Sequence, residues 1–252
     1  MTSGIDIDRF ARHLVLKEIG GPGQQALARA HVAIIGAGGL GAPAALYLAA
    51  AGVGTISLID ADTVTVDNLQ RQIIFRTRHI GTAKAKTGAR ALRALNPGTK
   101  VRSIIKALDS ENAKRLIGKA DLVLDGCDNY ETRYAVNEAC LATGKPLISG
   151  AVGRWDGQVS IFNARPDAPC YRCWVPETPP DAETCERVGV VGALTGVIGS
   201  MMALETIKHI CGAGQTLDGR IHLFDGLSMQ SRTVKLDKDP QCPGCGSQSG
   251  AA

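Results

Sequence analysis

Short apolar runs alternate with longer, more polar segments through the first 150 residues of the chain. The apolar runs predict strands at 31–36, 54–60, 100–105, 121–125 and 146–150. The segments around them predict helices at 6–14, 22–29, 41–51, 83–95, 110–118 and 130–143. Regular alternation of strand and helix is typical of a parallel sheet that is covered by helices. The pattern therefore predicts an α/β protein with a doubly wound, mostly parallel sheet.

The pattern changes after Gly153. The runs GQVSIFN, RIHLFDG and RTVKL alternate apolar and polar residues over short lengths, which predicts antiparallel strands that continue the sheet. A helix is expected at 192–211, and 176–187 is expected to form an extended loop. We interpret residues 1–252 as one continuous domain, with N-terminal helices in 1–30, a nucleotide-binding half in 31–150 and a second half in 151–252.

Composition narrows the class of protein. The chain is 44% hydrophobic and carries a formal charge of +4, without any block of five like charges, so nothing indicates a nucleic-acid partner. Residues 32–59 are uncharged, but six glycines and Pro43 interrupt them, which favours two strands around a helix over a membrane span. The first ten residues have neither a basic nor an apolar segment typical of a secretion signal, so we expect a cytoplasmic protein without a membrane partner.

The first predicted strand leads directly into a glycine-rich turn. Gly36, Gly38 and Gly41 have the spacing of the dinucleotide fingerprint of Rossmann-like folds, and Gly39 lies between them. The first glycine permits a tight turn, the second lets phosphate approach the backbone, and the third lets helix and strand pack closely. The unpaired N–H groups of the helix start would then face an anion. The motif alone does not separate nicotinamide, flavin and adenylate binders.

Polar residues follow the other parallel strands, at the edge where such sheets bind ligands. Asp60 and Asp62 end the second strand, where an acid can bind ribose hydroxyls. Helix-terminus attraction amounts to only about 0.3–1 kcal/mol, so a triphosphate needs positioned cations, which Arg71 and Lys84 could supply. A triphosphate usually brings Mg²⁺, and Asp128, in the DGCDN segment that ends in Asn129, is the natural carboxylate for it.

Four of the eight cysteines form two pairs of identical spacing. They are Cys170 and Cys173 in CYRC, and Cys242 and Cys245 in CPGC. Two C-x-x-C pairs supply the four thiolates of a closed, tetrahedral structural zinc site. We therefore expect a structural Zn²⁺ that joins the C-terminal segment to a mid-chain loop, with no open position for substrate.

Together these segments resemble the MoeB/ThiF group of E1-like enzymes, which adenylate the C-terminal glycine of small ubiquitin-like sulfur carrier proteins. The resemblance covers nearly the whole chain and rests on RFARHLVLKEIG, GAGGLGAP, DADTVTVDNLQRQ, the Lys84 region, DGCDN, CYRCW and CPGC. It implies the E1-like fold, with zinc on the four paired cysteines and Asp128 near magnesium. It also implies that ATP is bound by Gly39, Asp60, Asn68, Arg71 and Lys84.

The resemblance also implies a reaction and its partners. The carboxylate of a MoaD-like or ThiS-like carrier would attack the α-phosphorus of ATP and form an acyl adenylate, which prepares the carrier for thiocarboxylate formation in molybdopterin or thiamine-thiazole biosynthesis. Arg12 would reach the ATP of a partner subunit, which implies a homodimer, and sulfur would come from a separate donor. Cys185, beside Glu183, Glu186 and Arg187, stands where the family carries its thioester or acyl-disulfide cysteine.

Two other classes of function stay open at the level of sequence. An NAD-dependent oxidoreductase would use the glycine turn and Asp60 equally well, but it would leave the 68–71 cluster and the cysteine pairs without a role. A scaffold that binds nucleotide without catalysis would not need Arg71, Lys84 and Asp128 together.

Overall fold

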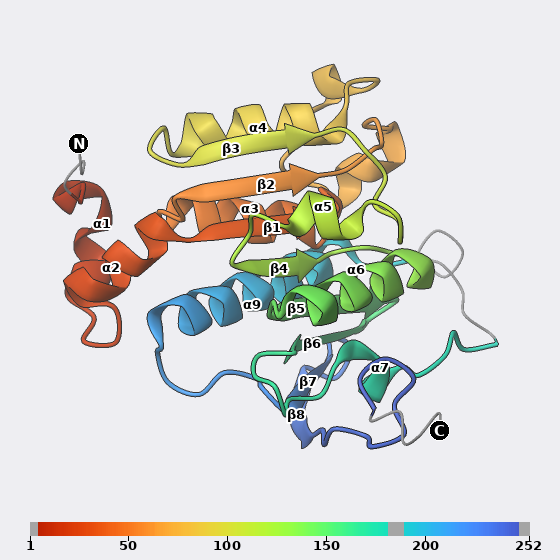
Figure 1. Cartoon of the computed structure of the whole chain (residues 1–252). Coiled ribbons are helices and arrows are strands. Elements are labelled where there is room, and N and C mark those ends of the chain that lie inside the picture. The colour runs from red at the N-terminus through yellow and green to blue at the C-terminus, as the bar shows by residue number, and fades with distance from the viewer. Residues whose placement is uncertain (1–4, 181–188, 247–252) are drawn as a thin grey trace.

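A computed structural model describes residues 5–180 and 189–246, and it contains one eight-stranded sheet (Figure 1). The strand order is β3-β2-β1-β4-β5-β6-β7-β8. The strands are β1 (His31–Ile35), β2 (Thr55–Ile59), β3 (Lys100–Ile104), β4 (Leu122–Asp125), β5 (Leu147–Gly153), β6 (Asp156–Phe162), β7 (Arg220–Asp225) and β8 (Gln230–Lys235).

The sheet has a parallel and an antiparallel half. Strands β3, β2, β1, β4 and β5 are all parallel, and their order reverses between β1 and β4. Strand β5 pairs in parallel with β4 through residues 147–149 and antiparallel with β6 along its full length. Strands β7 and β8 continue the antiparallel half. This is the predicted fold class, a doubly wound parallel sheet continued by antiparallel strands.

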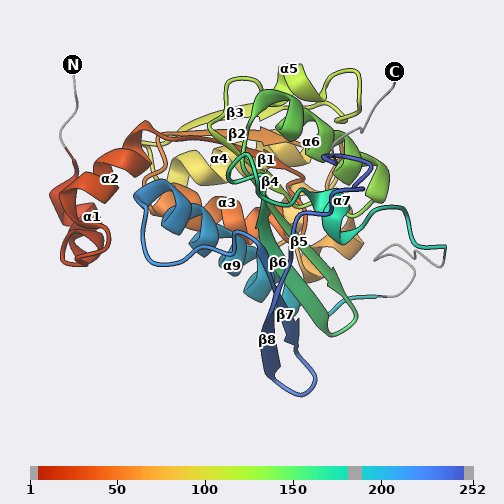
Figure 2. The same cartoon turned by 60° about the horizontal axis from the view of Figure 1, so that its bottom comes forward.

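The helices form two layers on the two faces of the sheet. They are α1 (Ile7–Leu14), α2 (Gly20–Arg29), α3 (Gly41–Ala50), α4 (Lys84–Leu95), α5 (Ala113–Ile117), α6 (Tyr130–Thr143), α7 (Tyr171–Trp174) and α9 (Gly192–Cys211), with 3₁₀ helices at Val66–Gln70 and Thr77–His79. Helix α9 packs against α2 and α3, and α3 against α4, whereas α5 packs against α6 on the other face (Figure 2).

Each face of the parallel half has its own apolar core. Ile34, Ile56 and Leu124 belong to the core beneath α3, α4 and α9, whereas Ala33 and Val123 belong to the core beneath α5 and α6. Successive residues of a strand point to opposite faces, so a strand covered on both sides is apolar at every position. This explains the uninterrupted apolar runs of the sequence.

Two predicted boundaries are wrong by three residues, and each has a cause in the structure. The helix expected at 110–118 begins only at Ala113, because the Asp109 carboxylate accepts the N–H groups of Glu111 and Asn112 at 3.0 and 2.9 Å and holds a turn there. The strand expected to end at residue 150 runs on to Gly153, because β6 pairs with it beyond the end of the parallel ladder.

Among the helices of the described ranges, none combines the length and the apolar character that a membrane crossing requires.

Candidate functional site

The glycine turn lies between β1 and α3, where the strand order reverses. Gly36 has φ +88°, a conformation that side chains rarely adopt. A Cβ added to Gly41 would lie 1.8 Å from the Gly36 carbonyl oxygen, so the start of α3 presses directly on the turn. At the start of α3 the Ala42 N–H donates to the Gly38 carbonyl at 2.9 Å and Pro43 has no N–H, so among these first positions the Gly41 N–H remains for an anion.

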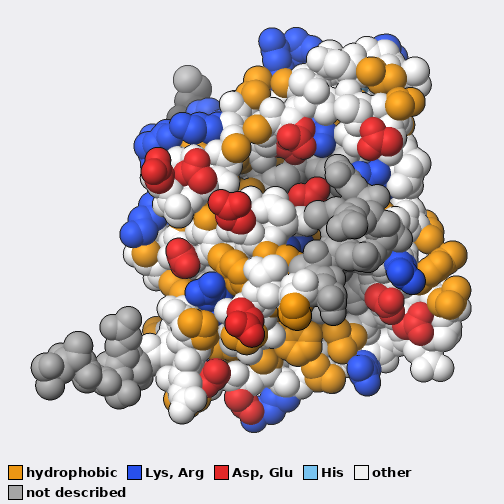
Figure 3. Space-filling view, turned by 90° about the vertical axis from the view of Figure 1, so that its right-hand side faces the viewer, with side chains coloured by type: hydrophobic (Ala, Val, Ile, Leu, Met, Phe, Trp, Pro, Cys, Tyr) orange, Lys and Arg blue, Asp and Glu red, His pale blue; other side chains and the backbone are white. Residues whose placement is uncertain are grey.

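A cavity of about 300 Å³ lies next to this turn. Nine of the residues that the sequence singles out line it, namely Gly36, Gly38, Gly39, Asp60, Asp62, Arg71, Lys84, Asp128 and Asn129. They come from the segments that follow β1, β2 and β4 and from the start of α4, which are far apart in the sequence. Figure 3 views the molecule from the end toward which the parallel strands point, and acidic and basic side chains stand close together there.

Asp60 is held rigidly at the end of β2. One carboxylate oxygen accepts the Ala37 N–H at 2.7 Å and the other accepts the Asp62 N–H at 2.8 Å. Burial raises the pKa of this carboxyl, and the two N–H groups act against the rise. Each oxygen keeps a second lone pair, so a fixed acceptor for hydroxyl groups faces the cavity.

Cations line the same cavity. The Lys84 Nζ lies 3.0 Å from a carboxylate oxygen of Asp62, and the lysine side chain is 9% exposed whereas that of Asp62 is 70% exposed. The Arg71 guanidinium donates to the Asp67 carbonyl at 3.0 Å. Lys106, which the sequence analysis missed, also lines the cavity because it follows β3 at the same edge. Three positive side chains can therefore face an anionic ligand.

The segment after β4 supplies an exposed carboxylate. Asp128 precedes Asn129, the N-cap of α6, whose side-chain oxygen accepts the Thr132 N–H at 2.9 Å. The Asn129 amide also donates to the Asp128 carboxylate at 3.4 Å. Asn129 thus has a structural role in addition to its place in the cavity wall. Asp128 is exposed, and its oxygens suit a hard cation such as Mg²⁺.

A buried arginine that the sequence analysis missed lies beneath this segment. Arg133 on α6 donates to a carboxylate oxygen of Asp125 at 2.9 Å and to the Ser149 hydroxyl at 3.0 Å. It also donates to the carbonyls of Cys127 and Gly150. Asp125, the first residue of the DGCDN motif, was the signal in the sequence that could have pointed to Arg133. A buried aspartate requires a cationic or hydrogen-bonding partner.

Three of the predicted residues do not line the cavity. Gly41 packs against the Gly36 carbonyl and has no side chain to offer a ligand. Asn68 is buried and forms a capping box with Thr65, which shapes the segment that carries Arg71. Arg12 is exposed on α1. This helix lies at the end of the sheet opposite the carboxyl ends of the parallel strands (Figure 1). Cys185 and most of the 176–187 loop lie outside the described residues.

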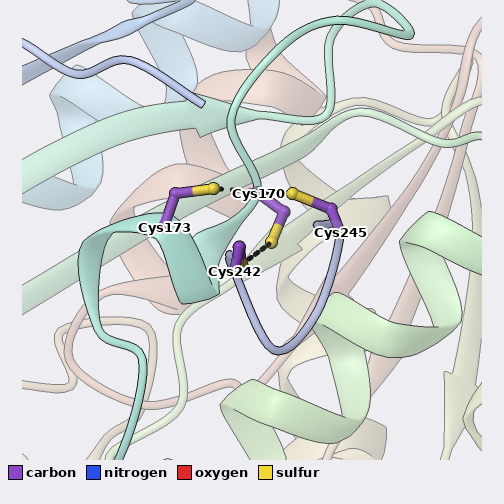
Figure 4. A group of neighbouring side chains, drawn as sticks. All are labelled: Cys170, Cys173, Cys242 and Cys245. Carbon is purple, nitrogen blue, oxygen red and sulfur yellow. Dashed lines mark hydrogen bonds between the residues drawn. The ribbon is translucent and has the colours of Figure 1, made fainter. Parts of the chain in front are cut away.

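The two C-x-x-C pairs come together in space (Figure 4). The sulfurs of Cys170 and Cys242 lie 3.6 Å apart, those of Cys173 and Cys245 lie 3.5 Å apart, and all four are within 4.8 Å of one another. A tetrahedral Zn²⁺ with bonds of about 2.3 Å would separate its sulfurs by roughly 3.8 Å. The four thiols therefore fit a zinc ion, and the cluster could hold a metal.

Without a metal, the environment keeps two of these thiols protonated. Burial raises the pKa of Cys173 to about 11 and that of Cys170 further. A bound cation would reverse this preference, because it stabilises thiolates directly.

Comparison with known proteins gives a consistent result. The model of the ThiF family matches residues 10–244. The chain is 42% identical to the sulfur carrier protein adenylyltransferase of Thermus thermophilus, over 96% of this chain and 92% of that protein. It is 40% identical to the SAMP-activating enzyme E1 of Haloferax volcanii, over 98% and 92%.

A solved structure of Escherichia coli MccB with MccA-N7isoASN shares the fold, with a TM-score of 0.84 at 21% identity, over 96% of this chain and 75% of that one. The family match, which spans the glycine turn, the cavity and three of the four clustered cysteines, assigns the protein: this chain belongs to the ThiF family.

Proposed function

We propose that the protein adenylates the C-terminal glycine carboxylate of a ubiquitin-like sulfur carrier protein, with ATP as the adenylate donor and pyrophosphate as the product. The observation that carries the proposal is the cavity that gathers the glycine turn, Arg71, Lys84 and Asp128 at the reversal point of the sheet. The name of the Thermus relative, which is 42% identical over nearly the full length of both chains, supports the same activity.

In this reaction the carboxylate oxygen attacks the α-phosphorus, and the bond between the α-phosphorus and the bridging oxygen breaks. The attacking carboxylate is ionised at neutral pH, so the enzyme needs neither a nucleophile of its own nor a general base. The residues of this chain align the reactants and neutralise charge. Lys84 and Arg71 would offset the charge on the phosphates, and the backbone of the glycine turn lines the same cavity.

Asp60 would fix the ribose, because its carboxylate is held at the cavity by two backbone N–H groups. Asp128 would hold Mg²⁺, which would neutralise and orient the leaving pyrophosphate. In the cysteine cluster we propose a structural zinc, since four thiolates leave no coordination position for substrate.

The same proposal covers the partners. Arg12 would complete the site of a second subunit in a homodimer, because α1 places it at the end of the molecule opposite its own cavity. A separate protein would donate sulfur to the adenylated carrier, in molybdopterin or thiamine-thiazole biosynthesis and in the cytoplasm. A covalent role of Cys185 and the single-domain organisation of residues 1–252 belong to this proposal as well.

The experiment combines the purified protein, ATP, Mg²⁺ and each candidate carrier, with ATP–pyrophosphate exchange and the mass of the carrier as readouts. We expect carrier-dependent exchange and a carrier mass raised by one adenylate. Asp128→Ala should abolish exchange while the protein stays folded. Binding of NAD without any exchange, for every MoaD-like and ThiS-like carrier, would contradict the proposal and favour an oxidoreductase.

A further inference from the structure

We propose that Arg133 is a positioning residue which sets the magnesium affinity of the site by fixing the backbone that carries Asp128. The inference rests on the proposed function, since it assumes that Mg·ATP binds in the cavity. Arg133 is one of the residues that line the cavity, but we derive its role from the protein groups to which its guanidinium donates hydrogen bonds.

The guanidinium fills the fork where β4 and β5 separate. The parallel ladder between these strands ends at the pair Asp125 and Ser149. Beyond this pair the chain after β4 turns toward Asp128, whereas β5 continues beside β6. Arg133 bridges the gap, because its Nη2 donates to the Cys127 carbonyl on one side and to the Gly150 carbonyl on the other. It therefore takes the place of the next rung of the ladder.

The peptide bond directly before Asp128 is oriented by this contact. The Cys127 carbonyl belongs to that peptide bond, and Arg133 binds it. The N–H of Cys127 donates to a carboxylate oxygen of Asp125 at 2.9 Å, and Asp125 is itself bound by Arg133. Both polar groups of the residue before Asp128 are thus held by one buried ion pair.

The charge of Arg133 is already compensated. Asp125 is 1% exposed and Arg133 is 6% exposed, and the Ser149 hydroxyl donates to the same carboxylate at 2.8 Å and accepts from Arg133. Both terminal nitrogens of the guanidinium are occupied by protein acceptors. We therefore assign the effect of Arg133 to geometry and not to direct neutralisation of phosphate.

A lysine cannot replace this arginine. An ammonium group can keep the charge pair with Asp125, but it lacks the planar fork that binds two carbonyls and a carboxylate at once. Arg133→Lys therefore removes the positioning contact while it keeps the buried charge balanced. Ser149→Ala is a milder change that removes one partner from both Asp125 and Arg133.

The test measures ATP affinity in buffer with Mg²⁺ and in magnesium-free buffer without chelator, which leaves the cysteine cluster intact. We expect Arg133→Lys to reduce the tightening of ATP binding by Mg²⁺ about tenfold, with binding in magnesium-free buffer unchanged. Ser149→Ala should reduce it in the same direction by a smaller factor. Arg115→Lys, at an exposed arginine of α5, is the matched control and should change neither value.

A double-mutant cycle with Asp128→Asn tests whether Arg133 acts through Asp128. If Arg133 acts through Asp128, the double variant Arg133→Lys with Asp128→Asn loses no more of the magnesium effect than Asp128→Asn alone. An unchanged magnesium effect in Arg133→Lys, or losses that multiply in the double variant, would overturn the inference. If Arg133→Lys does not fold, Ser149→Ala decides, and an unchanged magnesium effect there counts against the inference. Wild-type protein that binds no ATP at all would instead contradict the proposed function.

Discussion

At the scale of single residues, Lys84 shows how a cation can be presented to a ligand. Its stem is buried, yet its ammonium group is paired only with the exposed carboxylate of Asp62 among the described residues. The Asp62 carboxylate is exposed, so water can solvate it when a phosphate takes its place beside the lysine. A phosphate can therefore compete for Lys84 at small cost, whereas the buried stem keeps the ammonium group at the cavity.

We predict that Lys84→Met lowers pyrophosphate exchange about 10²- to 10³-fold, because it removes a positioned charge from a site of low dielectric. The melting temperature should stay close to that of the wild type. Lys86→Met, two residues further along α4 at an exposed position, is the control and should leave exchange unchanged. Equal pyrophosphate exchange by Lys84→Met and the wild type would exclude a role of Lys84 in the reaction.

Position 41 requires glycine because there is no room for a side chain beside the Gly36 carbonyl. Gly41→Ala would place a methyl group 1.8 Å from the Gly36 carbonyl, which is backbone and cannot turn aside. We predict a loss of at least about 1–3 kcal/mol in the free energy of unfolding, measured by urea denaturation.

The control for this prediction is Gly196→Ala in α9. A Cβ added at Gly196 meets nothing within 4 Å, so the change should be neutral or should stabilise by about 0.5–1 kcal/mol through helix propensity. If both variants proved equally stable, close packing at the glycine turn would not be the reason for glycine at position 41.

At the scale of elements, β1 and β2 are linked by a side-chain contact between the first residue of β1 and the middle residue of β2. The His31 Nε2 lies 2.8 Å from the Ser57 hydroxyl, and the His31 N–H donates to the Asp121 carboxylate at 2.7 Å. Burial lowers the pKa of His31 below 6.5, and the positive charge of Arg102 acts in the same direction. The folded protein therefore favours the neutral imidazole.

The lowered pKa of His31 determines the direction in which stability changes with pH. As the pH falls through about 6.5, the unfolded chain takes up a proton on His31 before the folded protein does, so the free energy of unfolding decreases with decreasing pH. We predict that His31→Gln, which cannot titrate, shows a shallower decrease between pH 7.5 and 5.5 in urea titrations. Identical slopes for both proteins would show that partial burial does not lower the pKa of His31 in the folded protein.

At the scale of the whole molecule, the cysteine cluster joins two distant parts of the chain. Cys170 is the N-cap of α7 and Cys173 lies within this helix, which packs against α6, whereas Cys242 and Cys245 follow the last strand of the antiparallel half. A bound zinc would close a loop of about 70 residues around the second half of the sheet. The metal would thus tie the end of β8 to the helix layer that carries Arg133.

We predict one zinc ion per chain in the purified protein and none in Cys242→Ser. Loss of the metal should destabilise the protein by at least about 3 kcal/mol, which corresponds to a melting temperature lower by about 6–12 °C. Cys211→Ser, at a cysteine outside the cluster, serves as the control and should keep both the zinc and the melting temperature. A wild-type protein without zinc and with the same stability as Cys242→Ser would exclude the structural metal.

Most elements of the fold could be predicted, because strand and helix patterns depend on residues that are close in the sequence. The boundaries that were wrong depend on other segments or on a local side-chain turn. The end of β5 is set by its pairing with β6, and the start of α5 by the Asp109 carboxylate. Periodicity carries neither kind of information.

The sequence by itself determined the class of fold, the glycine turn and the two cysteine pairs, since each is a pattern that depends on spacing along the chain. Only the tertiary structure decided which further side chains join the predicted ones in the cavity and which are buried beneath it. Lys106 joined the site and Arg133 became the partner of Asp125 because strands far apart in the sequence end at one edge of the sheet. Burial of a side chain is a property of that assembly, and no local pattern of residues encodes it.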